Sequence, residues 1–161
     1  MGGNFLSNIL VADFSASGVT AKAAEAIAKA VGGELYEIIP QAPYTNADLN
    51  WKDKHSRSST EMQDEQSRPA LAAPVKDLSE YDTVFVGFPI WWGVEPRVVD
   101  TFLDQAGLSG KKMIPFATSG GSGMAYAADH LKAWYPQLGW AEGKLVTARS
   151  AGDWAKAAVN G

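Results

Sequence analysis

One strand-to-helix turn organises this chain, Phe14-Ser15-Ala16-Ser17-Gly18-Val19-Thr20. The apolar run Ile9-Leu10-Val11-Ala12 before it is typical of a strand buried on both faces of a parallel sheet. After it, apolar residues recur at helical spacing as far as Val31, and Gly32-Gly33 ends that helix. The turn therefore combines hydroxyl side chains with the N–H groups of a helix start, a combination that suits a phosphate.

Composition limits the classes of function. The chain has 161 residues, of which 46% are hydrophobic. This size and composition predict that residues 1–161 form a single domain with a substantial core. The chain has no cysteine, which excludes disulfides, thiolate nucleophiles and cysteine-ligated metals, so a redox role would need a bound cofactor. The net charge is −4 and no basic cluster exceeds two lysines, so we expect no nucleic-acid partner. No apolar run reaches the roughly 20 residues of a membrane span and no basic secretory segment begins the chain, so we expect no membrane span and a cytoplasmic location.

The rest of the chain alternates predicted strands and helices. Strands are expected at 34–39, 82–89, 112–118 and 144–147, and helices at 95–106, 124–135 and after Ser150. The strand at 34–39 carries Glu34 and Glu37, which suits a sheet edge. Pro115 cannot donate to a strand ladder and therefore predicts a bulge.

Residues 41–77 form a long polar insertion with only a fragment of helical pattern at 58–66. A connection of this length is unusual in a compact domain and is often functional. Its side chains Trp51, His55, Arg57 and Arg68 could cover a ligand. The alternative is a surface crossover with solvated charges.

Strands that alternate with helices predict a parallel sheet with helices on its faces, whose ligand lies beyond the carboxyl ends of the strands. Three unusual loops follow such ends, at 15–20, 89–95 and 117–123. The first lacks both the lysine of a nucleoside-triphosphate loop and the spaced glycines of a dinucleotide fold, so a monophosphate fits it better.

The other two loops suit a flat ring. Trp91 and Trp92 could stack on it, and Gly93 permits the adjacent peptide to turn over. The alternative is that both tryptophans belong to the core or to an interface. The loop after 112–118 is rich in glycine and hydroxyl groups, so its backbone could approach the ring edge.

Three motifs, FSASGVT, FPIWWG and PFATSGGSG, together resemble the flavodoxin family of FMN proteins, especially members with a long polar insertion after the second strand. The resemblance extends from Ile9 to about Trp154. It implies an α/β flavodoxin-like three-layer sandwich, a five-stranded parallel sheet of order 2-1-3-4-5 with helices on both faces, and FMN as cofactor. The implied cofactor-binding residues are Ser15, Ala16, Ser17, Gly18, Val19, Thr20, Pro89, Ile90, Trp91, Trp92, Gly93, Ala117, Thr118, Ser119, Gly120 and Gly121.

Two residues depart from the family pattern. Val19 stands where the first loop commonly has asparagine, which removes a side chain able to bind phosphate or brace the loop. Asp13 stands where many relatives have an aromatic residue. A carboxylate there would be buried and close to a dianionic phosphate, so we hypothesise that Asp13 tunes or impairs the cofactor site.

The expected function is electron transfer through bound FMN, with redox partner proteins or a small electron acceptor as partners and a monomer or weak dimer as the assembly. Trp92-Gly93 is the segment expected to contact N5 of the flavin. One alternative is an FMN-dependent NAD(P)H:quinone-type reductase, so an enzymatic role stays open, and another is a flavodoxin-fold binding domain that has lost flavin.

No catalytic constellation or metal site is expected, and His55 and His130 are interpreted as surface residues. The insertion distinguishes a carrier from a reductase. A flavin edge left open would suit a protein partner, whereas a roofed pocket with Arg57 or Arg68 pointing in would suit a small substrate.

Overall fold

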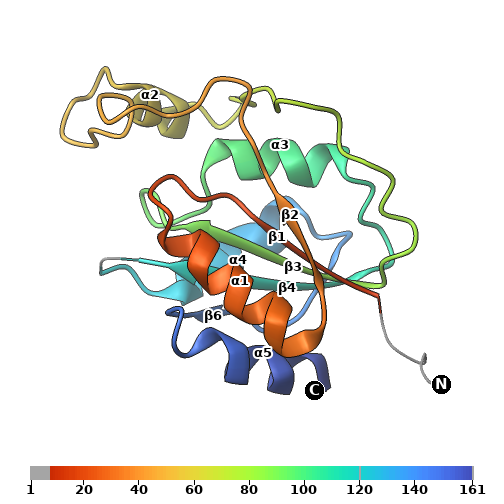
Figure 1. Ribbon diagram of the computed structural model, residues 1–161. Coiled ribbons are helices and arrows are strands. Elements are labelled where there is room, and N and C mark those ends of the chain that lie inside the picture. Colours follow the sequence, from red (N-terminus) through yellow and green to blue (C-terminus); the bar gives the residue numbers. More distant parts are fainter. Residues whose placement is uncertain (1–7, 120, 161) are drawn as a thin grey trace.

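The computed structural model describes residues 8–119 and 121–160, which form a parallel sheet between layers of helices (Figure 1). The strands are β1 (Ile9–Asp13), β2 (Glu34–Glu37), β3 (Thr83–Pro89), β4 (Lys112–Thr118), β5 (Gly139–Trp140) and β6 (Lys144–Leu145). The helices are α1 (Val19–Val31), α2 (Arg57–Gln63), α3 (Arg97–Gln105), α4 (Met124–Trp134) and α5 (Ala151–Asn160). Neighbouring strands are parallel in the order β2-β1-β3-β4-β5, with β6 also paired to β4, which confirms the predicted order.

Each face of the sheet has its own apolar core. Leu10 and Ala12 of β1 belong to the cluster that contains the buried side chains of α3 and α4. Ile9 and Val11 belong to the cluster that contains the buried side chains of α1 and α5. Because side chains alternate along a strand, the continuous apolar run of β1 supplies both cores. The predicted three-layer sandwich is therefore correct.

The fifth position of the sheet differs from the prediction. The expected strand 144–147 is shorter, and β5 precedes it, so two short strands share this edge. The carbonyls of Met113 and Ala117 accept hydrogen bonds from Ala141 and Val146 at 2.7 and 2.9 Å, so the backbone nitrogen of Pro115 faces the same outer chain.

Pro115 predicts a bulge in β4, but the extra residue lies in the outer chain that contains β5 and β6. Between the register pairs Met113↔Trp140 and Phe116↔Lys144 the outer chain advances four residues while β4 advances three. The pairing of β4 with β3 is uninterrupted, so the missing donor interrupts only the outer strand.

The long insertion is closed at its base. Strand β2 ends at Glu37, two residues earlier than expected, and the chain beyond it forms an antiparallel contact in which Gln41 donates to Ala70 and Ala72 donates to Ile39, both at 2.8 Å. The insertion's one helix in the described residues, α2, agrees with the helical fragment expected at 58–66. The Arg97 guanidinium of α3 donates to carbonyls at the end of α2, including that of Met62 at 2.9 Å. These bonds fix the insertion beside the sheet.

Within the ranges 8–119 and 121–160, none of the helices has both the length and the apolar character needed to cross a membrane.

Candidate functional site

The three predicted loops converge at the carboxyl ends of β1, β3 and β4. The hydroxyls of Thr20 at the start of α1 and Thr118 at the end of β4 are 2.7 Å apart and buried. The N–H of Ile90 donates to the Thr118 carbonyl at 3.0 Å, which joins the loops after β3 and β4. Thr20 and Thr118 are 98 positions apart in sequence, and their hydrogen bond joins the first loop to the third.

The first turn of α1 is open to an anion. Gly18 precedes the helix with a φ of 93°, a conformation that a side chain would strain, and its N–H donates to Ser15 Oγ at 3.0 Å. In the described residues no side chain caps this end of α1, so its first-turn N–H groups are left for water or a ligand. Ser15 braces the turn, and Ser17 is exposed.

A cavity of about 480 Å³, here called the cradle cavity, lies along these loops. It is lined by Ser17, Val19, Lys22, Pro89, Ile90, Trp91, Thr118, Ser119, Val146, Thr147 and Ala148. Lys22 brings the one positive charge among these lining residues.

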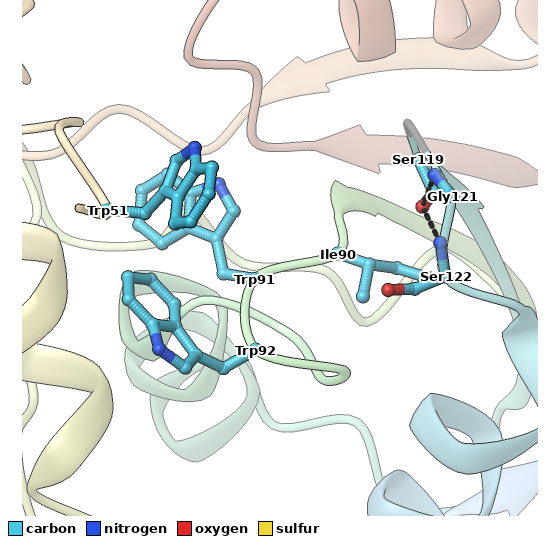
Figure 2. Close-up of a pocket in the computed structure, with 7 residues that line it drawn as sticks. All are labelled: Trp51, Ile90, Trp91, Trp92, Ser119, Gly121 and Ser122. Carbon is cyan, nitrogen blue, oxygen red and sulfur yellow. Dashed lines mark hydrogen bonds between the residues drawn. The ribbon is translucent and has the colours of Figure 1, made fainter.

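A second cavity of about 470 Å³, here called the tryptophan cavity, borders the first. Its lining residues are Trp51, Ile90, Trp91, Trp92, Ser119, Gly121 and Ser122, and Figure 2 shows the tryptophans on one side and the loop after β4 on the other. Ser119 Oγ accepts hydrogen bonds from the N–H groups of Gly121 and Ser122 at 3.0 and 2.7 Å, which fold this loop.

The two adjacent tryptophans differ in environment. Trp91 packs edge-to-face against Phe14 and Tyr44, with ring centroids 5.6 and 5.4 Å away. Its ring therefore joins the loop after β1, which contains Phe14, to the insertion, which contains Tyr44. Trp92 is 48% exposed and has a φ of 50°, the left-handed region that disfavours non-glycine residues. Trp91 and Val94 exchange backbone hydrogen bonds at 2.9 and 3.1 Å around Trp92-Gly93, which holds the strained turn.

The sequence-predicted residues divide into groups. Ser17, Val19, Pro89, Ile90, Trp91, Thr118 and Ser119 line the cradle cavity, and Trp92 and Gly121 line the tryptophan cavity. Ser15 and Ala16 line a separate hollow toward β2, and Gly18, Thr20, Gly93 and Ala117 line neither of the two main cavities. Gly120 lies outside the described residues.

The sequence prediction missed Lys22 and the segment 146–148, which also line the cradle cavity. Residues 146–148 follow the carboxyl end of β6, so the rule that indicated the other three loops applies to them as well. Lys22 is an exposed residue of α1, and a charged residue on the polar face of a helix does not by itself indicate a ligand.

Asp13 lies at the end of β1 beneath these loops and is 4% exposed. Its Oδ2 atom is buried and has no hydrogen-bond partner among the described residues, and Glu37 of β2 is the register partner of Asp13. Burial, followed by the negative charges of Glu37 and Glu25, raises the pKa of Asp13 from 3.8 to about 7. Asp13 is therefore a carboxyl group that the fold holds largely protonated below neutral pH.

The insertion contributes Trp51 to the tryptophan cavity, but its arginines point elsewhere. The Arg57 guanidinium lies 3.8 Å from the centre of the Tyr44 ring and bonds to Glu61 at 2.8 Å. Arg68 pairs with Asp104 at 2.7 Å. The insertion thus adds an aromatic wall to the site, and neither arginine lines either cavity.

His55 is exposed as expected, but the interpretation of His130 as a surface residue is wrong. His130 Nδ1 lies 3.0 Å from Oε1 of the fully buried Glu95, and its side chain is 15% exposed. Burial lowers the pKa of His130 and raises the pKa of Glu95. Glu95 belongs to a buried polar network with Asp100, whose Oδ1 accepts a 2.9 Å bond from the Tyr135 hydroxyl.

No cluster of three or more His, Asp or Glu side chains suited to a metal ion occurs in the part of the chain that the structure describes.

Comparison with known proteins places this geometry in a family. A family model described as Flavodoxin matches residues 8–161. No match was found among curated proteins.

Two similar solved structures come from Bacteroides uniformis and Bacteroides eggerthii, each provisionally named a flavoprotein. Both are 48% identical to this chain, with TM-scores of 0.90 and 0.89; the alignments cover 93% and 95% of this chain and 98% of each of those chains. A flavoprotein of Lactobacillus acidophilus in complex with FMN is 23% identical over 86% of this chain and 93% of its own, with a TM-score of 0.70, and shows the same fold. Because the family model covers nearly the whole sequence, the chain belongs to the flavodoxin family.

Proposed function

We propose that this protein binds FMN at the cradle cavity and serves in electron transfer. The observation that carries the proposal is the convergence of three loops, joined by the Thr20–Thr118 hydroxyl pair, around a cavity beside an uncapped helix start. The FMN complex of the Lactobacillus acidophilus relative, which has the same fold, supports the identity of the ligand.

The residues present fit the parts of FMN. The first-turn N–H groups of α1 and the exposed Ser17 hydroxyl would bind the phosphate, and Lys22 would balance part of its charge. The segments 90–93 and 119–121 would border the flavin ring. Bound FMN supplies the redox chemistry, in which one or two electrons are moved, and the protein controls access to it.

Asp13 is a residue that could prevent FMN binding, and it therefore matters for the alternative of a flavodoxin-fold binding domain without flavin. As a carboxylate it would disfavour a nearby phosphate, whereas the protonated form is neutral. Since the pKa of Asp13 is raised to about 7, the opposing charge is small under mildly acidic conditions. We infer that Asp13 makes FMN affinity depend on pH and does not abolish binding.

An FMN-dependent reductase is the second candidate, and one observation favours it. Trp51 of the insertion forms part of a cavity next to the cradle, which gives a small substrate a place to bind. A reductase pocket roofed by the insertion would have Arg57 or Arg68 pointing in; both instead pair with other residues, which favours the carrier.

The test of electron transfer uses FMN-loaded protein. The protein is reduced anaerobically with dithionite and mixed with cytochrome c, and the visible flavin absorption is followed. We expect that absorption to return as cytochrome c is reduced, and a protein whose reduced flavin does not react would contradict the carrier role. Steady-state consumption of NADH or NADPH with a quinone would identify a reductase instead.

A further inference from the structure

The turn at residues 91–94, here called the tryptophan turn, holds an exposed ring on a strained backbone. Trp92 has a φ of 50° and Gly93 a φ of 85°, and Trp92 is the one non-glycine residue with a positive φ in the described ranges. Two successive positive φ angles define a tight hairpin turn in which asparagine followed by glycine is favoured. The Trp92 ring is 48% exposed, so its own packing does not explain the strain. Strain of this kind persists only where the surrounding structure holds it.

Helix α4 packs against the tryptophan turn and against the chain that follows it. A Cβ atom at Gly93 would lie 3.1 and 3.3 Å from Cδ2 and Cε2 of Tyr126, so the Tyr126 ring lies directly against the turn. His130 Nδ1 lies 3.0 Å from Oε1 of Glu95, two residues beyond Gly93. Tyr126 and His130 are four residues apart and therefore share one face of α4. That face contacts the turn at Gly93 and the chain after it at Glu95.

The Glu95 carboxyl group is fully buried, which is costly for a group that ionises. It lies next to Asp100, and burial and the Glu95 carboxyl together raise the pKa of Asp100 to about 9, so that Asp100 keeps its proton at neutral pH. An apolar side chain would be less costly to bury than a carboxyl group. The bond to His130 gives the carboxyl group a role that an apolar side chain could not have, because it ties the chain after the turn to α4.

We propose that Glu95 and His130 are positioning residues for the tryptophan turn, in a role that rests on the proposed function because this turn would border the flavin ring. Their bond fixes the chain after the turn, and the bond from the Ile90 N–H to the Thr118 carbonyl fixes the chain before it. Neither Glu95 nor His130 lines the cradle cavity or the tryptophan cavity. Both therefore act through the turn and not by contact with a ligand.

The first measurement is amide hydrogen exchange of the cofactor-free protein. The Val94 N–H donates to the Trp91 carbonyl at 3.1 Å, so its exchange rate reports whether the turn is closed. We expect His130→Leu to speed this exchange about tenfold, because leucine cannot bond to Glu95. His130→Asn should restore most of the protection, since its amide can still donate. The matched control is His55→Leu, which changes the other histidine of the chain, an exposed one, and should leave the rate unchanged.

The second measurement titrates the same variants with FMN and with riboflavin, followed by flavin fluorescence. A displaced turn weakens contacts to the ring, which both ligands share, and does not alter the phosphate site. We expect His130→Leu to weaken both ligands by the same factor, about fivefold, and His130→Asn to restore both affinities. A residue that contributed only to overall stability would leave both affinities unchanged as long as the protein is folded.

The Tyr135 N–H, which donates to the Leu131 carbonyl at 2.9 Å, reports separately whether α4 stays folded. If α4 loses this protection in His130→Leu, Glu95→Met removes the same bond without changing α4, and it should speed the exchange of Val94 by a similar factor. Methionine has the length of glutamate but no carboxyl oxygen.

Unchanged exchange of the Val94 N–H in a variant whose α4 stays folded would overturn the attachment of the turn to α4. Faster exchange with unchanged affinity for both flavins would overturn the positioning role. Failure of the parent protein to bind FMN would instead reject the proposed function, while hydrogen exchange would still decide whether Glu95 and His130 hold the turn.

Discussion

Asp13→Asn should make the protein more stable at alkaline pH, by an amount that depends on pH. The native state binds the Asp13 proton more tightly than the unfolded chain, because burial raises the pKa from 3.8 to about 7. The free energy of unfolding of the parent therefore falls as pH rises between these values and is level above them. Asparagine has the same shape and does not ionise. From pH 5 to pH 8 the stability advantage of Asp13→Asn should grow by about 3 kcal/mol.

The assay is urea unfolding of the cofactor-free parent and variant, followed by tryptophan fluorescence at several pH values. The comparison cancels the other titrating groups, which the two proteins share. Glu37→Gln is a useful second variant, since it removes a neighbouring negative charge that contributes to the raised pKa of Asp13 and should move the pH step downward. A stability difference that stays constant from pH 5 to pH 8 would show that burial does not raise the pKa of Asp13.

Three further predictions concern the same site. Asp13→Asn should bind FMN about tenfold more tightly than the parent at pH 8 and equally at pH 5, by fluorescence titration; equal affinities at both would reject charge repulsion. Thr20→Val should lower the free energy of unfolding by about 1–2 kcal/mol in urea, because the buried Thr118 hydroxyl loses its partner, and adding Thr118→Val should recover part of this loss. Trp92→Gly should raise the free energy of unfolding by about 1 kcal/mol, because glycine adopts the positive φ without strain, and it should weaken FMN binding. A lower free energy of unfolding would show instead that the Trp92 ring stabilises the apo protein.

The parallel sheet could be predicted from the sequence because the apolar runs of its central strands fit few other arrangements. A continuous apolar run such as Ile9–Ala12 requires cover on both faces, and the loops after such strands must share one edge. The strand order came from the resemblance to flavodoxins, since strand spacing alone does not distinguish among orders.

The features that were not predicted depend on contacts between distant residues. The bulge that Pro115 predicts for 112–118 does not occur in that strand, and only the register of the neighbouring chain shows that the extra residue lies there. The pairing of His130 with Glu95 joins residues 35 positions apart, and no local pattern in the sequence links the two. Trp51 was one of four insertion residues that could cover a ligand, and only the fold separates it from the two arginines.

Binding of FMN through its phosphate is tested by titrating the cofactor-free protein with FMN and, in parallel, with riboflavin, followed by flavin fluorescence at pH 6. We expect saturable binding of one FMN with a Kd of about 1 μM or below, and binding of riboflavin at least about tenfold weaker because riboflavin lacks the phosphate that the start of α1 would bind. Equal affinity for the two would contradict the phosphate site at Ser17 and α1. No saturable change with FMN would contradict the proposed function.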